Sequence, residues 1–434
     1  MAPCPSVDPD GWSAGFEAFA ARLDRRFPRV ESRQRMRRFL RGMMSDLQRV
    51  NCWTLAQRMG EDRPGPMQHF LSKAVWDDDG LRSDLRDYVT ETLGHPEGVL
   101  VIDETGDLKK GTATIGVQRQ YTGTAGRIEN SQVAVYLTYA SPIGHALIDN
   151  ALYMPRSWMD DPARREAAGA PEDLAFATKP ALAQRMIEKT VDAGVQARWV
   201  TGDEVYGANP ALRAALARRG IGSVLAVAKS DIVTTKAGPK KAIDLAVTLP
   251  DNAWNRISAG QGAKGERLYD WAIIGVTDGD LPGHCYLMIR RSIGDGAYAF
   301  YRAQSPTSVP LRTLVRVAGI RWSVEDDFQS CKELAALDEH QVRRWTPWHR
   351  WTMIAMLAYA FLAVTTARAR KIEPAEGLIP LTVNEVRHLF VEVAMPRPSV
   401  TKAFLLAWSW WRRHRQLLAK HCHYHRQAVK LQLN

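Results

Sequence analysis

Three acidic residues are placed where they could bind metal ions: Asp103, Asp203 and Glu325. Asp103 ends an apolar run over residues 99–102 that predicts a buried strand, and Asp203 follows a second short run over residues 199–202. Glu325 lies in a segment with helical spacing. Two strand-end carboxylates and one helical carboxylate can converge on two Mg²⁺ ions, because Mg²⁺ prefers oxygen ligands. Such a metal pair activates a water or hydroxyl and stabilises the leaving oxygen in phosphodiester chemistry.

Each carboxylate alone has an ordinary structural alternative. A strand-end Asp is commonly a turn former or helix cap, and Arg321 with Glu325 could form a surface ion pair. The helix around Glu325 favours the chemical interpretation, because one helical face carries four residues spaced by four, three and four: Arg321, Glu325, Phe328 and Lys332. Arg321 and Lys332 would neutralise phosphates on either side of Glu325.

The composition is that of a globular protein with a polyanionic partner. The 434 residues are too many for one ordinary domain, and a hydrophobic content of 45% suffices for a sizeable core. Lys and Arg number 58 against 47 Asp and Glu, giving a formal net charge of +11. Residues 22–41 hold nine Arg, and residues 393–434 hold eight Lys or Arg with no Asp or Glu. Two basic segments near the chain ends, on either side of the carboxylates, favour an enzyme that binds DNA.

Both basic ends contain candidate DNA contacts. Residues 54–60 and 66–71 resemble a helix–turn–helix with a stretched turn, although a plain helical bundle with a solvated basic face is an equal alternative. Four side chains of this motif would then face a DNA groove: Gln57, Arg58, Gln68 and His69. Three arginines of the tail are expected to contact the DNA backbone, while the tryptophans beside them pack: Arg412, Arg413 and Arg415. Lys109 and Lys110 could also reach the backbone, or could serve solubility alone.

Neither a disulfide framework nor a signal peptide is indicated. The five cysteines are scattered and include no C-x-x-C pair, and the N-terminus is acidic. Residues 351–367 carry no charge but are a little short for a membrane span, so a buried core helix is expected. Three tail histidines at alternate positions (421, 423 and 425) do not share a helical face, so a metal site there is not expected. We therefore predict a cytoplasmic protein without a membrane partner.

The pattern changes from helices to strands near residue 98 and predicts a mixed α/β fold. One helix is predicted over residues 311–337. The other predicted elements are helices at 179–193 and 209–219 and strands at 115–121, 132–139, 144–153, 223–228, 267–277, 284–290 and 298–303. Five parts follow: a helical, basic DNA-binding region (1–95), the first part of the catalytic core (96–230), a β-rich insertion (231–310), the second part of the core (311–370) and a helical basic region (371–434).

These motifs resemble those of bacterial insertion-sequence transposases of the DDE superfamily, in the branch with a Y-R-E-K signature. That signature places an Arg four positions before the catalytic Glu and a Lys seven positions after it, as Arg321, Glu325 and Lys332 stand here. Three further segments look like stretches of the family, the first two being those that carry its aspartates: VIDETG at 101–106, TGDEVYG at 201–207 and LDEHQVR at 337–343. The resemblance spans roughly residues 30 to 365.

The resemblance implies an RNase H-like α/β core, split by the β-rich insertion and flanked by helical N-terminal and C-terminal regions. Asp103, Asp203 and Glu325 would be catalytic and would bind two Mg²⁺ ions, for which Mn²⁺ could substitute. Arg321 and Lys332 would bind DNA phosphates. The enzyme would cleave the ends of an insertion sequence and join the 3′-hydroxyls to target DNA.

The expected partners follow from this chemistry. They are the double-stranded DNA of the element ends and of the target, and a second copy of the chain, because two ends must be paired. No nucleotide cofactor is expected, since the chain has no P-loop pattern. The protein would associate with the nucleoid when bound to DNA. Two alternatives remain open: a nuclease of the same fold without strand transfer, and a catalytically retired transposase that only binds DNA.

One position departs from the family pattern. The signature's Tyr would fall at residue 318, where this chain has Ala, so the resemblance does not extend to a hairpin route of cleavage. The insertion of some relatives contributes an aromatic that stabilises a flipped base. Trp254 and Trp271 are the candidates here, with packing inside the insertion the favoured alternative. Glu104 and Glu204 are excluded from the site, because strand alternation points them away from the aspartates.

Overall fold

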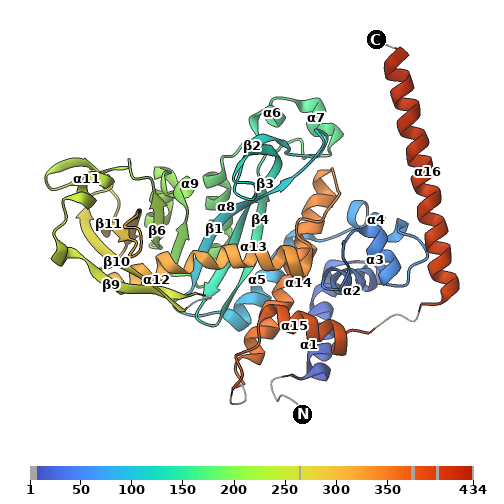
Figure 1. Ribbon diagram of the computed structural model, residues 1–434, viewed down its shortest axis with the longest axis horizontal. Coiled ribbons are helices and arrows are strands. Elements are labelled where there is room, and N and C mark those ends of the chain that lie inside the picture. The colour runs from blue at the N-terminus through green and yellow to red at the C-terminus, as the bar shows by residue number, and fades with distance from the viewer. Residues whose placement is uncertain (1–6, 263–264, 373–376, 397–399, 433–434) are drawn as a thin grey trace.

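The computed structural model describes residues 7–262, 265–372, 377–396 and 400–432. It contains a large mixed sheet covered by helices, a helical region beside it, and one long helix that projects from that region (Figure 1). The mixed α/β architecture predicted from the sequence is confirmed.

The first half of the sheet is formed by β1 (Val99–Leu108), β2 (Gln118–Thr122), β3 (Arg127–Ser141), β4 (Gly144–Leu152), β5 (Trp199–Gly202) and β6 (Gly222–Val227). β1 is central: it pairs antiparallel with β3 and parallel with β5, while β4 pairs antiparallel with β3 and β6 parallel with β5. Four successive residues of β1, Val99 to Ile102, are fully buried. Because neighbouring residues of a strand point to opposite faces, both faces of the sheet are covered at β1.

The predicted insertion continues this sheet. Its strands are β7 (Ile232–Thr235), β8 (Gly238–Lys241), β9 (Asn255–Gly262), β10 (Gly265–Val276), β11 (His284–Arg291) and β12 (Tyr298–Ser305). β12 pairs antiparallel with β6, and the order then runs β11, β10, β9, while β7 and β8 form a separate hairpin. A small apolar cluster, including Val227, Leu287 and Phe300, packs this half together with α11 (Ala242–Val247).

The helix predicted over residues 311–337 is two helices, α12 (Leu311–Ile320) and α13 (Trp322–Ala335), which meet at Arg321. The prediction of one helix was wrong because of tertiary contacts near the junction. Gly319 lies so close to β9 that a Cβ atom there would stand 1.9 Å from the Ala259 carbonyl oxygen. Only a glycine permits this approach of α12 to the sheet.

Helix α14 (Trp345–Ala369) is the centre of the main apolar core. It is long and apolar enough to cross a membrane by composition, but 94% of its most apolar window is buried inside the protein. The predicted buried core helix is thus confirmed. The N-terminal helices pack around it: Phe16 and Phe361 have ring centroids 5.4 Å apart, and Phe39 and Trp351 5.9 Å.

The N-terminal helices are α1 (Pro9–Leu23), α2 (Val30–Met43), α3 (Cys52–Arg58), α4 (Gly65–Ser72) and α5 (Asp78–Leu93). The remaining helices are α6 (Arg156–Met159), α7 (Pro162–Ala167), α8 (Lys179–Asp192), α9 (Glu204–Gly207), α10 (Pro210–Arg218), α15 (Val383–Leu389) and α16 (Lys402–Gln432). Buried residues of the N-terminal helices and of the sheet belong to one continuous cluster, so these parts share a core.

Helix α16 docks by its first third and then projects away (Figure 1). Trp408 is buried and donates its indole N–H to the Glu61 carbonyl oxygen at 2.9 Å, and the Trp411 ring lies 4.8 Å from that of Trp53. From Arg413 to Val429 every residue is exposed.

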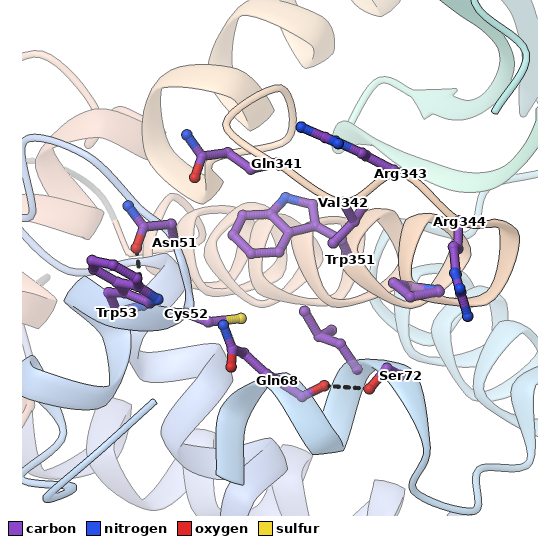
Figure 2. Close-up of a pocket in the computed structure, with 12 residues that line it drawn as sticks. Asn51, Cys52, Trp53, Gln68, Ser72, Gln341, Val342, Arg343, Arg344 and Trp351 are labelled. Atoms are coloured by element: carbon purple, nitrogen blue, oxygen red, sulfur yellow. Dashed lines mark hydrogen bonds between the residues drawn. The ribbon is translucent and has the colours of Figure 1, made fainter. Parts of the chain in front are cut away.

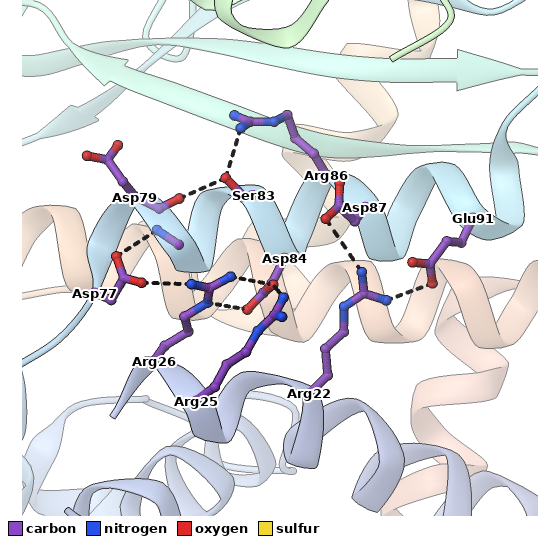
Figure 3. A network of polar contacts seen from close by, with 11 residues as sticks. Arg22, Arg25, Arg26, Asp77, Asp79, Ser83, Asp84, Arg86, Asp87 and Glu91 are labelled. Carbon is purple, nitrogen blue, oxygen red and sulfur yellow. Dashed lines mark hydrogen bonds and ion pairs between the residues drawn. The ribbon is translucent and has the colours of Figure 1, made fainter. Parts of the chain in front are cut away.

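A buried carboxylate ties α5 to the turn after α1 (Figure 3). The side chain of Asp84 is fully buried and accepts hydrogen bonds from Arg25 and from Arg26, whose Nε lies at 2.7 Å. Arg26 also donates at 2.8 Å to Asp77, the residue that caps the N-terminus of α5. Burial would raise the pKa of Asp84, but the hydrogen bonds from Arg26 and Arg25 outweigh it and hold this pKa below its usual range.

We predict that Asp84→Asn lowers the free energy of unfolding by about 2–3 kcal/mol at neutral pH, because two arginines lose their buried partner. Since the folded-state pKa of Asp84 lies below the unfolded one, this stabilisation is present above about pH 4 and is lost as the pH falls through the folded value. Urea unfolding of Asp87→Asn provides the control. Asp87 is 51% exposed and 3.7 Å from Arg22, so this change should cost less than about 1 kcal/mol. Equal losses in the two variants would contradict the prediction.

Candidate active site

Asp103 stands where the parallel pairing of the sheet stops. β1 pairs with β5 only as far as Ile102 and Gly202, so Asp103 lies one residue beyond the last parallel pair. The prediction that the strand ends at Asp103 is wrong, because β1 continues to Leu108. Along this extension β1 pairs only with β3, and Asp103 itself is paired with Tyr136 of β3. The longer antiparallel partner holds the backbone of Asp103 in extended conformation while the β5 side stays open.

Asp203 follows β5 directly and caps the short helix α9. Its Oδ1 accepts the backbone N–H of Val205 at 2.9 Å. β5 itself is anchored to β6 by the Thr201 hydroxyl, which donates to the Val224 carbonyl oxygen at 2.8 Å. Because β1 and β5 are parallel neighbours, both aspartates emerge at the same edge of the sheet.

Glu325 reaches this edge from α13, and Arg321 connects it to Asp103. One guanidinium nitrogen of Arg321 lies 3.2 Å from Asp103 Oδ2, and the other donates to Glu325 Oε1 at 2.7 Å. The predicted i, i+4 ion pair between Arg321 and Glu325 is therefore present, but it also includes the strand carboxylate 218 positions earlier in the chain.

The predicted helical face packs along one face of β1. Lys332 donates to the Thr105 hydroxyl at 2.7 Å, so the arginine and the lysine of this face contact strand residues two positions apart. Phe328 is buried between them, and its ring lies 5.4 Å from that of Tyr136. Residues two apart in a strand share a face, which places Asp103 and Thr105 on the same side of the sheet.

Asp327 anchors the opposite side of α13. Its carboxylate is fully buried and accepts hydrogen bonds at 2.7 Å from Thr138 of β3, His145 of β4 and Tyr359 of α14. Three bonds from three elements set the rotation of α13 about its axis, which in turn directs Glu325 toward the sheet edge. The sequence showed only an acidic residue two positions after Glu325.

Burial and like charge shift the aspartates. Burial, the nearby charge of Asp203 and that of Glu104 raise the pKa of Asp103 to about 7, although Arg321 and a backbone N–H oppose this. The pKa of Asp203 is also raised, first by burial and then by the charge of Glu104. Each shift shows that ionising these carboxylates is costly without a compensating cation.

Glu104 points away from Asp103, as strand alternation predicted, but its surroundings were not foreseen. Its two oxygens accept hydrogen bonds from Lys179 at 2.6 Å and from the Tyr206 hydroxyl at 2.7 Å. The charge of Glu104 still reaches Asp203. Tyr206 lies three positions after Asp203, a helical spacing that could have indicated its place beside the site. Glu204 is exposed.

The third acidic residue of β1, Asp107, forms a pair with His340 that was not predicted from the sequence. His340 is buried and its Nε2 lies 2.8 Å from Asp107 Oδ2. Lys109 joins them, 3.8 Å from Asp107 and 3.4 Å from the His340 carbonyl oxygen, with a side chain only 14% exposed. Lys109 thus has internal partners, whereas Lys110 is exposed.

A cavity of about 450 Å³ opens beside the carboxylates, between Asp203 and the strands of the predicted insertion. Ala318, which stands at the Tyr position of the Y-R-E-K signature, lines this cavity together with Arg321. Trp271 also lines it but is only 1% exposed. Trp254 does not; it lies 6.0 Å from the ring of Tyr298, as the packing alternative expected.

The candidate DNA contacts at the chain ends have different surroundings. Gln57 accepts a hydrogen bond from Arg412, and Arg58 lies 3.2 Å from Asp46, so these side chains connect elements of the protein. Gln68, Arg413 and Arg415 are exposed. The tail histidines and Cys422 are exposed on α16.

The chain matches a known protein family over the segment that carries both aspartates. The sequence pattern of the DDE superfamily endonucleases matches residues 22–242, about half of the chain, including both aspartates. The chain belongs to this family. DDE endonucleases act with divalent metal ions, and the helix that carries Glu325 lies beyond the matched range.

Two individual proteins are similar to this DDE endonuclease over different parts of the chain. The chain is 33% identical over 183 residues to a probable transposase for insertion sequence element IS701 from Microchaete diplosiphon. The match covers 42% of this chain and spans 45% of the relative. A piggyBac transposase solved as a synaptic complex with hairpin DNA is similar over 94% of this chain and 78% of its own, with 10% identity and a TM-score of 0.44.

The carboxylates of the site fit a divalent cation by their chemistry. In the described ranges, no three His, Cys, Asp or Glu side chains stand close enough to hold a metal ion as they are. Asp103 and Glu325 are instead joined by a cation of the protein itself, the Arg321 guanidinium. An all-carboxylate donor set suits a hard ion such as Mg²⁺. The pKa of both aspartates is raised first by burial and then by nearby negative charge, which such an ion would neutralise.

We predict that Asp103→Asn stabilises the protein in a metal chelator at pH 8, by about 1–3 kcal/mol. The folded-state pKa of Asp103, about 7, lies above its unfolded value. The favourable contribution of Asp103 is therefore complete below about pH 4 and is lost as the pH rises through 7. Thermal unfolding of the wild type and the variant at pH 5 and pH 8 measures the difference. A gap that is equal at both pH values, or larger at pH 5, would refute the pKa assignment.

Proposed function

We propose that the protein is a DNA transposase that binds the ends of an insertion sequence, cleaves them and joins the liberated 3′-hydroxyls to target DNA. The proposal rests on Asp103 and Asp203, which follow the last pair of two neighbouring parallel strands, and on Arg321, which joins Asp103 to Glu325, in a chain of the DDE endonuclease family. The similarity to an insertion-sequence transposase supports the same reaction.

The topology supports an RNase H-like catalytic core. Five strands run in the order β4-β3-β1-β5-β6, with antiparallel pairing on one side of β1 and parallel pairing on the other. In our proposal residues 96–230 and 311–370 form this core and residues 231–310 are the insertion. The basic regions 1–95 and 371–434 bind DNA.

Asp103, Asp203 and Glu325 would hold two Mg²⁺ ions, with Mn²⁺ able to substitute. Such ions, when bound, activate the attacking water or 3′-hydroxyl and stabilise the leaving oxygen. The protein's own residues position the DNA. Arg321 suits bidentate contact with a phosphate once its carboxylate partners are neutralised, and Lys332 adds a point charge. The hydrogen bonds of Asp327 hold α13 in a fixed orientation, and α13 carries Glu325 and Lys332 and begins next to Arg321.

The proposed partners are double-stranded DNA and a second copy of the chain, since two element ends must be held together. Exposed Gln68, Lys110, Arg413 and Arg415 are the most accessible of the predicted DNA contacts. Gln57, Arg58, Lys109 and Arg412 would act mainly by positioning these elements. A bacterial cytoplasmic location, on the nucleoid when DNA is bound, follows from the substrate.

A nuclease without strand transfer is the second candidate, because both reactions use the same carboxylates. The two are distinguished by whether cut ends become joined to a target plasmid. A retired transposase would bind DNA and cut none.

We predict that Asp103→Ala, Asp203→Ala and Glu325→Ala each reduce Mg²⁺-dependent excision from a donor plasmid by at least about a thousandfold, because each removes a metal ligand. Binding to DNA in a mobility-shift assay should persist. Asp192→Ala, which removes an exposed carboxylate at the end of α8, is the control and should excise normally. Normal excision by any of the three site variants would exclude that residue from the site.

We also predict that α16 contributes phosphate contacts. Replacing Arg413, Arg415, Lys420 and Arg426 with Ala should reduce the slope of log binding constant against log salt concentration by about 3.6, since each lost contact removes about 0.9. The matched control removes four exposed charges elsewhere: Arg218, Lys236, Lys240 and Lys241. If both quadruple variants change the slope alike, α16 makes no specific contribution.

A further inference from the structure

A second cavity, separate from the one beside the carboxylates, lies between the N-terminal helices and the loop that follows α13 (Figure 2). Its volume is about 450 Å³. Gln341 and Arg343 lie on one side, Gln68 and Ser72 of α4 on the other, and Trp351 of α14 between them (Figure 2). The cavity belongs to neither the site described above nor the cavity beside it, since the two share no lining residue.

The walls suit a flat, apolar group. Trp351 closes the base of the cavity with only 1% of its surface exposed, and its indole N–H donates to the Ala336 carbonyl oxygen at 2.9 Å. The ring that is open to stacking is therefore the half-buried Trp53. Trp53 lines another side, held by its contact with Trp411 of α16. Aromatic side chains that are immobilised in this way bind planar rings at a small entropic cost.

The polar groups suit a ring with both donors and acceptors on its edge. Gln68 and Gln341 are exposed, and no hydrogen bond of either carboxamide is found among the described residues. Asn51 uses its Oδ1 to cap α3, accepting from Trp53 and Thr54, while its amide nitrogen makes no such bond. A carboxamide presents a donor beside an acceptor, which is the pattern that complements the edge of a nucleobase.

The charge of the rim suits an anion. Arg343 and Arg344 are exposed and form no ion pair within the described chain. The residues that line the cavity include no Asp or Glu. Guanidinium groups bind phosphate bidentately. Aromatic walls, free carboxamides and two unpaired arginines are together the recognition chemistry of a nucleotide.

We infer that this cavity, here called the Gln68–Gln341 pocket, binds one unpaired nucleotide of a DNA strand. The inference rests on the proposed function for its source of nucleotides. A duplex is too wide to enter a space of this volume, so the base must be outside the stack. The arginines at the rim would then contact the backbone on either side of it.

The position of the pocket relates it to the proposed cleavage site. Glu325 is in the first turn of α13, and the pocket is bordered by the loop that follows the last turn of this helix. Ten residues from Glu325 to Ala335 span about 15 Å. At about 3.4 Å per nucleotide, the strand bound in the pocket would be on the order of five nucleotides from the phosphate at Glu325. The pocket would thus read one base at a set spacing from the cut.

The test compares a 20-base-pair duplex with the same duplex carrying one unpaired thymidine, by fluorescence anisotropy on the full chain. The wild type should bind the bulged duplex about tenfold more tightly. The double variant Gln68→Ala, Gln341→Ala should lose this preference and bind both duplexes alike, with an affinity below that of the wild type for the perfect duplex, because Gln68 is also a proposed contact with duplex DNA. Arg343→Ala should weaken both. Arg218→Ala, an exposed arginine on α10, should behave as the wild type.

A photocrosslink locates the base directly. With 4-thiothymidine at the unpaired position, crosslinks should map to residues 51–53 or 341–351 in the wild type and disappear in the double variant. Equal binding of the two duplexes by the wild type, a preference that survives the double substitution, or crosslinks elsewhere would each overturn the inference.

Two further outcomes identify the source of failure. If free dTMP competes as well as the bulged duplex, the pocket takes free nucleotides and the assignment to a DNA strand is wrong. If the wild type binds no DNA at all, the proposed function fails together with the inference. Normal plasmid excision without any preference for the bulge rejects the inference alone.

Discussion

The guanidinium of Arg321 between Asp103 and Glu325 is the contact on which the site depends. Carboxylates from a strand and from a helix more than two hundred residues later are brought to one sheet edge, where burial raises the pKa of Asp103 and so makes its ionisation costly. Without a cation, their charges would oppose the packing of α13 on β1. Arg321 supplies that cation from the helix itself, and its own charge is kept by the two acidic partners.

The docking of α13 relies in turn on α14. Asp327 bonds to Tyr359 of α14 and to two strands, and Cys331 lies against the Ala355 carbonyl oxygen at 3.7 Å. Because α14 also packs against the N-terminal helices, one buried helix relates the predicted DNA-binding region to the carboxylates. The N-terminal helices and the sheet share one apolar core, so their relative placement is fixed by the burial of apolar side chains and not by a linker.

Several features could be predicted because they are local. The apolar run before Asp103, the spacing of Arg321, Glu325 and Lys332, and the length of the core helix each depend on residues close together in the chain. The extent of β1 could not, because it is set by pairing with β3. The junction at Arg321 escaped prediction for a similar reason: the close approach of Gly319 to β9 has no local signal. Lys109 was one candidate for DNA contact, and its contact with His340 comes from a loop more than two hundred residues away.

The sequence by itself determined the chemical types at the site, the basic ends, the mixed α/β class and the family pattern. These are properties of composition and of short spacings, which survive without knowledge of distant contacts. The tertiary structure alone decided which charges are neighbours: Arg321 with Asp103, Glu104 with Lys179 and Tyr206, and Asp327 with three separate elements. Electrostatic interactions depend on distance and burial, and both are set only when strands and helices far apart in the chain are packed together.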